Sequence, residues 1–192
     1  MSLRIVLAED ETIIRMDLRE QLESLGYQVV ADVADGETAV KVSRESRPDV
    51  VVMDIKMPGM DGISAAQKLT GETICPVVLV TAFSDAELIE KANEAGVMAY
   101  VMKPIRQGDL RPAIELAVSR FLEYRLLVDE VKDLAQRLET RKLLERAKGI
   151  LMDSHKLTET QAFQRIQKIS MDRRKSMKEI AEAILLADDL NA

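Results

Sequence analysis

The chain has 192 residues, of which 47% are apolar, so it can form one large or two small packed domains, and disorder is excluded. No apolar stretch approaches the roughly 20 residues of a membrane helix, and the N-terminus is too short for a signal peptide, so we expect a cytoplasmic protein with no membrane partner. The aromatic content of 3%, without Trp, argues against a platform of several aromatic rings for stacking single-stranded bases.

The net charge of -6 is unevenly distributed. Residues 1–139 carry 16 Lys and Arg against 25 Asp and Glu, whereas residues 140–192 carry 11 against 8. This asymmetry hints that the first part binds a cation and the last part a polyanion. The single cysteine, Cys75, excludes an internal disulfide, and its apolar surroundings predict a buried structural thiol.

Strands and helices alternate over the first 110 or so residues. The apolar pattern predicts strands over 5–8, 27–33, 50–54, 77–80 and 97–101, with helices over 12–25, 36–46, 62–69 and from 84 onward. Ser84 and Glu87 form a candidate capping box for the fourth helix. Five such alternations predict right-handed crossovers and a doubly wound, five-stranded parallel sheet of α/β class.

The third predicted strand ends in a carboxylate. Val50 to Met53 are all apolar, which suits a strand buried on both faces, and Asp54 follows directly. A turn sequence comes next, so Asp54 is expected at the carboxyl end of a central strand, where open α/β sheets bind ligands. Taken alone, this pattern also fits a carboxylate that merely begins a turn.

Further polar residues converge on the same edge of the predicted sheet. Glu9 and Asp10 end the first strand, Thr81 ends the fourth and Lys103 follows the fifth. Three neighbouring carboxylates repel one another unless a hard cation lies between them, and Mg²⁺ prefers such oxygen ligands. Asp54 is then a candidate nucleophile that forms an aspartyl phosphate, with Thr81 donating a hydrogen bond to the phosphoryl oxygens and Lys103 supplying an ion pair.

Residues 1–120 resemble a response-regulator receiver domain. The matching segments are Glu9-Asp10, residues 53–62 (MDIKMPGMDG), Thr81-Ala82 and Lys103-Pro104. The resemblance implies a flavodoxin-like receiver over 1–112 that takes a phosphoryl group on Asp54 from a sensor histidine kinase. It further implies a phosphoacceptor protein rather than an enzyme.

The same resemblance assigns the individual site residues. It implies that the backbone carbonyl of Lys56 joins Glu9, Asp10 and Asp54 in binding Mg²⁺. It also implies that Thr81 and Tyr100 form a switch pair and that the Lys103-Pro104 bond is cis. The plainer interpretation of Tyr100, a half-buried aromatic packed on the last strand, is compatible with that role.

A long helix follows the receiver, because residues 113–148 contain neither Gly nor Pro. Apolar residues recur there in steps of three and four, at Ile114, Ala117, Phe121, Tyr124, Val128, Val131, Ala135 and Leu138. This seam predicts a coiled-coil linker over 113–140 that joins two copies of the chain. Its expected dimer contacts are Phe121, Tyr124, Val128, Val131 and Leu138. The alternative is a long helix folded back on its own receiver.

The heptad register fails after Leu138, where the next seam positions are Lys142 and Glu145. The apolar stripe resumes out of phase at Leu143, which indicates a change of packing partner. Candidate capping boxes at Thr158 and Gln161, and at Ser176 and Glu179, precede two further amphipathic helices. Three short helices bury their faces only against one another, so residues 141–192 are predicted to form an all-α three-helix bundle.

The polar side of this bundle is basic, which by composition alone indicates only a solvated face. Its sequence, however, resembles the ANTAR domain over residues 141–152 (RKLLERAKGILM), 160–163 (TQAF) and 176–181 (SMKEIA). That family binds RNA hairpins in transcription antitermination. The candidate RNA contacts are Arg141, Lys142, Arg146, Lys148, Gly149, Arg165, Arg173 and Arg174.

The sequence predicts the surroundings of three further residues in the bundle. Phe163 is expected to pack in the core, so that base stacking would fall to arginine planes. Gly149 either permits close approach of backbone or RNA or packs against the second helix, and the sequence favours neither. The only histidine, His155, is expected to be a solvated residue in a connection.

The combined hypothesis is a phosphorylation-controlled protein that dimerises and binds RNA hairpins to prevent termination. One alternative is a DNA-binding response regulator, although no Gly-containing tight turn marks a helix-turn-helix motif. Another is a receiver-coil adaptor that binds only proteins, which a weak basic patch would have favoured.

Overall fold

The structure is a computed structural model that describes residues 2–82 and 86–189. The chain forms two compact units, Met1–Leu126 and Leu127–Ala192, each of which is described by itself. Within the described residues, no helix is long and apolar enough to cross a membrane.

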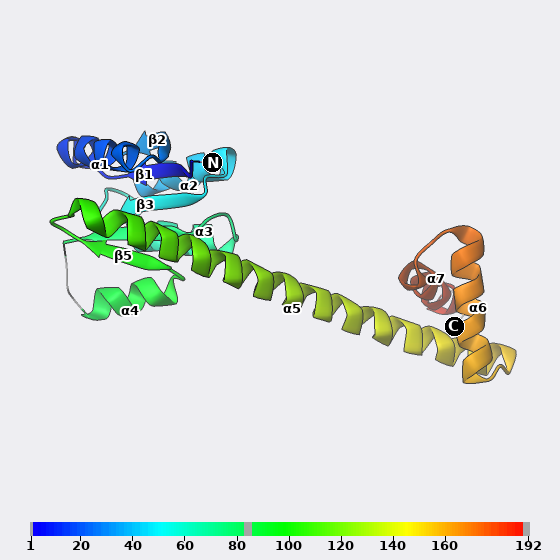
Figure 1. Ribbon diagram of the computed structural model, residues 1–192. Helices are drawn as coiled ribbons and strands as arrows, with labels where there is room; N and C mark the ends of the chain where they lie inside the picture. Colours follow the sequence, from blue (N-terminus) through cyan, green and yellow to red (C-terminus); the bar gives the residue numbers. More distant parts are fainter. Residues whose placement is uncertain (1, 83–85, 190–192) are drawn as a thin grey trace. The chain divides into compact units, whose positions relative to one another are not determined.

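The first unit is built on a parallel five-stranded sheet (Figure 1). Its strands are β1 Arg4–Ala8, β2 Gln28–Val33, β3 Val50–Asp54, β4 Val77–Thr81 and β5 Ala99–Met102. The strand order is β2-β1-β3-β4-β5, so β2 is added on one side of β1 and the later strands on the other. The carboxyl ends of β1 and β3 therefore form the topological switch point of the sheet. The predicted doubly wound fold is confirmed.

The helices between these strands are α1 Thr12–Ser24, α2 Gly36–Ser46, α3 Gly62–Gly71 and α4 Ala86–Glu94, and α5 Gln107–His155 follows β5. Two of them begin at aspartate caps: Asp35 accepts a hydrogen bond from the Thr38 backbone, and Asp61 accepts one from the Ser64 backbone, each at 2.8 Å. The predicted capping box at Ser84 lies outside the described residues.

Both faces of the sheet are buried, as the unbroken apolar strands predicted. On one face Val6, Val51 and Leu79 belong to a core that includes Ala39 of α2 and Leu69 of α3. On the other face Ile5, Val52 and Val80 pack with Leu18 of α1 and with Leu110, Ile114 and Ala117 of α5. Ile114 and Ala117 are fully buried in this core. Their predicted place in a coiled-coil seam is therefore wrong.

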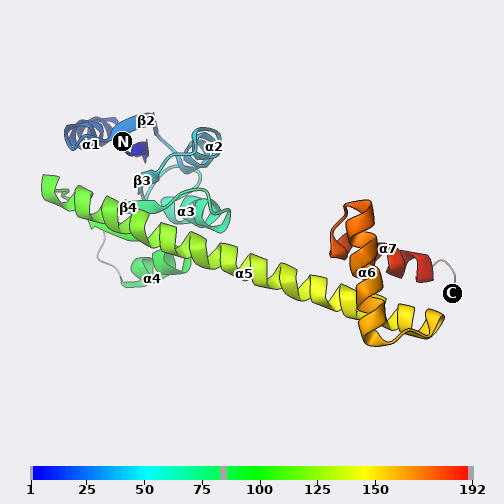
Figure 2. The ribbon, with the colours of Figure 1, turned by 45° about the vertical axis from the view of Figure 1, so that its right-hand side comes forward.

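Helix α5 is continuous for 49 residues (Figure 2). It crosses the predicted boundary at residue 140 without a break, so the last turns of α5 are the first helix of the bundle. The helix continues because no Gly or Pro near Leu138 stops it. The change of register after Leu138 alters only which face of the helix is apolar.

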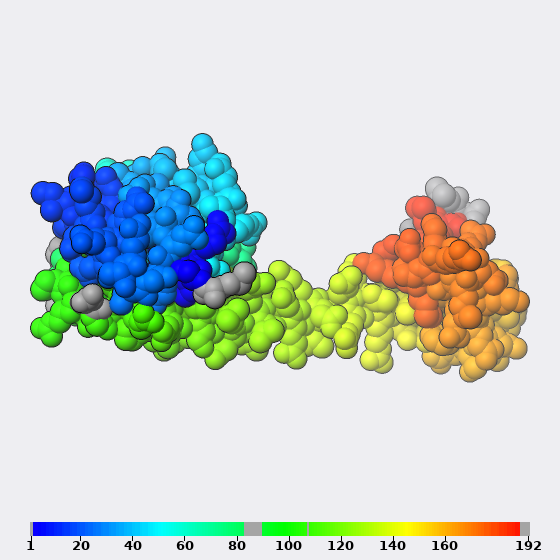
Figure 3. Space-filling view, turned by 45° about the horizontal axis from the view of Figure 1, so that its top comes forward, coloured from blue at the N-terminus to red at the C-terminus, as the bar shows by residue number. Residues whose placement is uncertain are grey.

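The second unit adds α6 Glu159–Arg173 and α7 Met177–Asp189 to the end of α5, and Figure 3 shows these helices in close contact. Its core contains Ala147 and Leu151 from α5, Ala162 and Ile166 from α6, and Ala181 from α7. Both predicted capping boxes are confirmed. Thr158 and Gln161 exchange side-chain to backbone hydrogen bonds, as do Ser176 and Glu179.

Candidate functional site

The carboxyl ends of the strands bring the predicted site residues to one edge of the sheet. Parallel pairing aligns Ala8 with Met53, Asp54 with Val80, and Thr81 with Met102. The residues that follow β1 and β5, which are Glu9 and Lys103, therefore lie beside Asp54 and Thr81. A small cleft of about 260 Å³ opens at this edge.

Three carboxylates face one another at this edge. Glu9, Asp10 and Asp54 each offer an oxygen within 4.8 Å of the others. Glu9 is fully buried, Asp54 is 7% exposed and Asp10 is exposed. Burial raises the pKa of Glu9, and the hydrogen bond from Lys103 opposes that rise. Crowded carboxylates that are partly open to solvent fit a hard divalent cation with retained waters.

Lys103 neutralises part of this negative charge. Its Nζ lies 2.8 Å from Glu9 Oε2 and 3.2 Å from Asp54 Oδ1. Burial of the ammonium opposes its charge, but the hydrogen bond to Glu9 and the charge of Asp54 outweigh burial and raise the pKa of Lys103. The predicted cis bond between Lys103 and Pro104 is confirmed.

The switch residues predicted from the resemblance differ in exposure. Thr81 is buried at the end of β4, whereas the Tyr100 side chain on β5 is 47% exposed. Tyr100 borders a surface hollow of about 350 Å³ together with Leu116 and Arg120 of α5. The ring therefore has open space on its solvent side.

Two residues that the sequence did not single out shape this site. A Cβ at Gly62 would lie 2.1 Å from the backbone oxygen of Asp54, so only glycine lets the loop after β3 close against Asp54. Arg15 on α1 donates from Nη1 to the Glu9 backbone oxygen at 2.6 Å and fixes the segment after β1. The turn spacing around Gly62 is the only sequence signal that could have indicated its role.

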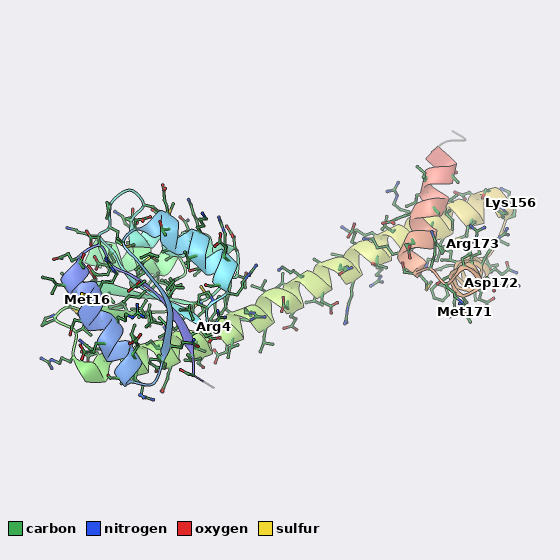
Figure 4. The ribbon with its side chains drawn as sticks, turned by 90° about the horizontal axis from the view of Figure 1, so that it is seen from above. Arg4, Met16, Lys156, Met171, Asp172 and Arg173 are labelled. Carbon is green, nitrogen blue, oxygen red and sulfur yellow. The ribbon has the colours of Figure 1, made fainter. Side chains whose placement is uncertain are left out.

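The second unit carries exposed basic side chains on α5 and α6 and directly after α6. Arg141, Lys142, Arg146, Arg165, Arg173 and Arg174 are all exposed. Figure 4 shows Arg173 beside Met171 and Asp172 at the end of α6. Lys148 differs, because it is only 8% exposed and its Nζ pairs with Glu145 at 2.9 Å and with Glu159 at 2.7 Å. These ion pairs tie α5 to α6, and an RNA phosphate would compete with two carboxylates for the Lys148 ammonium.

The structure also shows the surroundings of Gly149, Phe163 and His155, for which the sequence made separate predictions. A Cβ at Gly149 would meet nothing within 4 Å, so packing against α6 does not explain this glycine. Phe163 is 41% exposed, and its predicted place in the core is wrong. His155 is exposed, as predicted, but it is the last residue of α5 and does not lie in a connection.

An exposed apolar stripe runs along the middle of α5. Tyr124, Leu127, Val131, Leu134 and Leu138 are 39–64% exposed and recur in steps of three and four. Leu127 and Leu134 were not in the predicted seam. Of the predicted seam residues, Val128 is half-buried and Phe121 is 4% exposed, so the open part of the seam begins at Tyr124.

Two family models match the chain. The response regulator receiver domain matches residues 5–115, and the ANTAR domain matches residues 132–185. The chain belongs to the response regulators. ANTAR domains are RNA-binding domains of transcription antiterminators, so this response regulator joins a phosphorylation-controlled receiver to an antitermination output domain.

Similar proteins agree with this assignment. The transcriptional regulatory protein PdtaR of Mycobacterium tuberculosis is 52% identical over 95% of this chain and 89% of its own length. The regulatory protein AtoC of Escherichia coli is 35% identical over 71% of this chain but only 29% of its own length.

Solved structures match the receiver. The receiver domain of a modulated diguanylate cyclase from Desulfovibrio desulfuricans G20 has a TM-score of 0.60 and 30% identity, covering 65% of this chain and 99% of that one. A receiver domain of a sensor histidine kinase from Pseudomonas aeruginosa PAO1 has a TM-score of 0.56 and 29% identity, covering 62% and 99%. That structure holds a magnesium ion in its active-site cleft.

Proposed function

We propose that Asp54 of this response regulator accepts a phosphoryl group from a sensor histidine kinase at a Mg²⁺ site. The observation that supports this proposal is the acidic cluster of Glu9, Asp10 and Asp54 at the switch point of the sheet. The Lys56 backbone carbonyl completes the proposed ligand set. Bound Mg²⁺ would neutralise charge on the incoming phosphoryl group.

The surrounding residues then have distinct tasks in phosphoryl transfer. The Asp54 carboxylate attacks phosphorus, and the bond to the donor histidine breaks as the aspartyl phosphate forms. Lys103, already 3.2 Å from Asp54 Oδ1, pairs with a phosphoryl oxygen. The Thr81 hydroxyl donates to another oxygen, and the exposed Tyr100 ring moves inward beside Thr81. Phosphorylation therefore changes the surface formed by β5 and its neighbours.

We further propose that phosphorylation promotes a homodimer through α5. The stripe from Tyr124 to Leu138 is exposed, so the chain's own receiver does not cover it, and pairing with a second α5 would remove its apolar side chains from water. Val128 lies at the edge of this stripe. Phe121, which is 4% exposed, is outside the proposed contact.

RNA binding is proposed to use the exposed cations of the bundle. Arg141, Lys142, Arg146, Arg165, Arg173 and Arg174 would hold phosphates around a hairpin, and Gly149 would let RNA approach the α5 backbone. Lys148 is excluded from this set because two carboxylates already bind its ammonium. In a dimer, two bundles on one transcript would bind more tightly than either alone.

The experiment that tests this function compares ligands of equal charge. Binding of the full chain to a hairpin RNA, a duplex RNA and a duplex DNA is measured with and without beryllofluoride, a phosphoryl analogue. Preference for the hairpin, strengthened by the analogue, is expected. Preference for duplex DNA would favour the DNA-binding alternative, and no binding to any nucleic acid would favour the adaptor.

A further inference from the structure

A groove of about 600 Å³ lies between the end of α5 and the start of α6. Its volume is within the range of roughly 300–1,000 Å³ that is usual for small-ligand sites. Phe163 and Leu144 provide its apolar surface, Gln136 and Thr140 provide neutral polar groups, and Arg141 provides a cation. All of these residues belong to the second unit.

The exposure of Phe163 is the first observation that points to a ligand. Its neighbours on α6, Ala162 and Ile166, are fully buried in the bundle core, whereas the Phe163 side chain is 41% exposed and borders the groove. It is also the only aromatic residue after Tyr124 in the sequence. A flat ring at the mouth of a groove offers a stacking surface for another flat ring.

The charges of the groove select the kind of ligand. Lys148 is bound by Glu145 and Glu159, and Arg137 pairs with Asp133 at 2.8 Å. Arg141 has no carboxylate within 4.0 Å among the residues that the structure describes, so its guanidinium is the open cation of the groove. An anionic group beside the stacked ring is therefore favoured.

The neutral groups suit the polar edge of a nucleobase. The Thr140 hydroxyl donates to the Gln136 backbone oxygen at 2.8 Å, which leaves the Thr140 oxygen as an acceptor. The Gln136 side-chain amide offers both a donor and an acceptor. A flat apolar ring, a polar edge and a phosphate are the three parts of a nucleotide, and the groove presents a matching group for each.

We propose that this groove holds one unpaired base of an RNA loop, stacked on Phe163 with its edge toward Gln136 and Thr140 and its phosphate on Arg141. The proposal rests on the RNA-binding function proposed above and adds a base-reading site to it. A base inside a duplex is covered by its neighbours, whereas a loop base can leave the stack. The groove therefore distinguishes a hairpin loop from a duplex of equal charge.

The test is Phe163→Leu in the full chain, which keeps an apolar side chain but removes the stacking ring. Loss of one base–aromatic stack is expected to weaken hairpin RNA binding by roughly 5- to 150-fold, with binding to duplex RNA unchanged. Phe163→Tyr is the matched control and should retain hairpin binding. Arg141→Gln should weaken both RNAs and lower the salt dependence by about one phosphate contact.

Several results would overturn the site. Equal weakening of hairpin and duplex binding by Phe163→Leu would indicate a structural role, and unchanged hairpin binding would exclude stacking. If Phe163→Leu altered the monomer–dimer equilibrium but not the RNA affinity, a second chain rather than RNA would cover the groove. If the wild-type chain bound neither RNA, the proposed function itself would fail.

A second measurement uses the unaltered protein and does not depend on a variant that folds. Hairpin RNAs that carry 5-iodouridine at successive loop positions are irradiated in the complex, and the crosslinked peptide is sequenced. A crosslink to Phe163 at one loop position is expected. Crosslinks only to other residues, or none to Phe163 at any loop position, would contradict the proposal.

Discussion

Gly149→Ala separates the stability of the bundle from its RNA binding. Gly149 lies inside α5, and an added Cβ would meet no atom within 4 Å, so nothing in the protein opposes the substitution. Alanine restricts the unfolded chain more than glycine does and favours the helix by about 0.5–1 kcal/mol. We therefore expect the variant to be more stable than the wild type.

The expected shift is measurable by scanning calorimetry of the full chain. For a unit as small as this bundle, a stabilisation of 0.5–1 kcal/mol raises the unfolding midpoint by roughly 2–8 °C. Gly108→Ala is the matched control, because Gly108 belongs to the same helix, lies at its receiver end and also has open space around its Cβ position. Gly108→Ala should not affect RNA binding.

The same variant should bind RNA less tightly. If RNA approaches the backbone at Gly149, the added methyl group costs about 1–3 kcal/mol, or roughly a 5- to 150-fold loss of hairpin affinity in a fluorescence anisotropy titration. A destabilised Gly149→Ala variant would contradict the claim that the protein leaves open space for a Cβ at Gly149. A stabilised variant with unchanged affinity would refute the close approach of RNA.

Three further predictions concern the receiver and the coil. Asp54→Asn should abolish phosphate uptake from a small phosphodonor, as measured by intact-protein mass spectrometry, and retained labelling would refute the site. Val131→Glu should shift sedimentation of the phosphorylated protein toward monomer, whereas Lys132→Glu, one position away from the exposed stripe, should not; an unchanged mass for Val131→Glu would argue against the coil. Burial raises the pKa of Cys75 to about 12, so its contribution to stability is fully present below the unfolded thiol's pKa of 9.0 and is lost as the pH rises from there toward 12. The free energy of unfolding should fall by up to about 1.4 kcal/mol per pH unit in that window, and Cys75→Ala should show no such component in urea titrations.

The receiver could be predicted almost completely from the sequence, because its signals are local and agree with one another. The apolar run of β3 ends at Asp54, and the carboxyl ends of parallel strands necessarily meet at one edge of the sheet. The closure of the loop by Gly62 was not foreseen although Gly62 ends the matching segment 53–62, because its contact with the Asp54 backbone arises only in the folded chain.

Helix α5 and the second unit were harder to predict, because helical periodicity does not say what covers an apolar face. Ile114 and Ala117 fit the heptad seam but pack against the sheet, while Leu127 and Leu134 are exposed outside it. Lys148 was expected to contact RNA and Phe163 to pack in the core, yet Lys148 pairs with two carboxylates and Phe163 borders a groove. The environments of Lys148 and Phe163 depend on how α5 packs against α6, which the sequence pattern does not specify.

The most direct test of the central claim is the effect of Asp54 phosphorylation on hairpin RNA affinity. The dissociation constant of the full chain for a hairpin RNA is measured with and without beryllofluoride, in the wild type and in Asp54→Asn, with Mg²⁺ present. If phosphorylation controls RNA binding, the treated wild type binds more tightly and Asp54→Asn shows no change. Equal affinity in all four conditions would contradict it, because RNA binding would then be independent of the phosphoacceptor site.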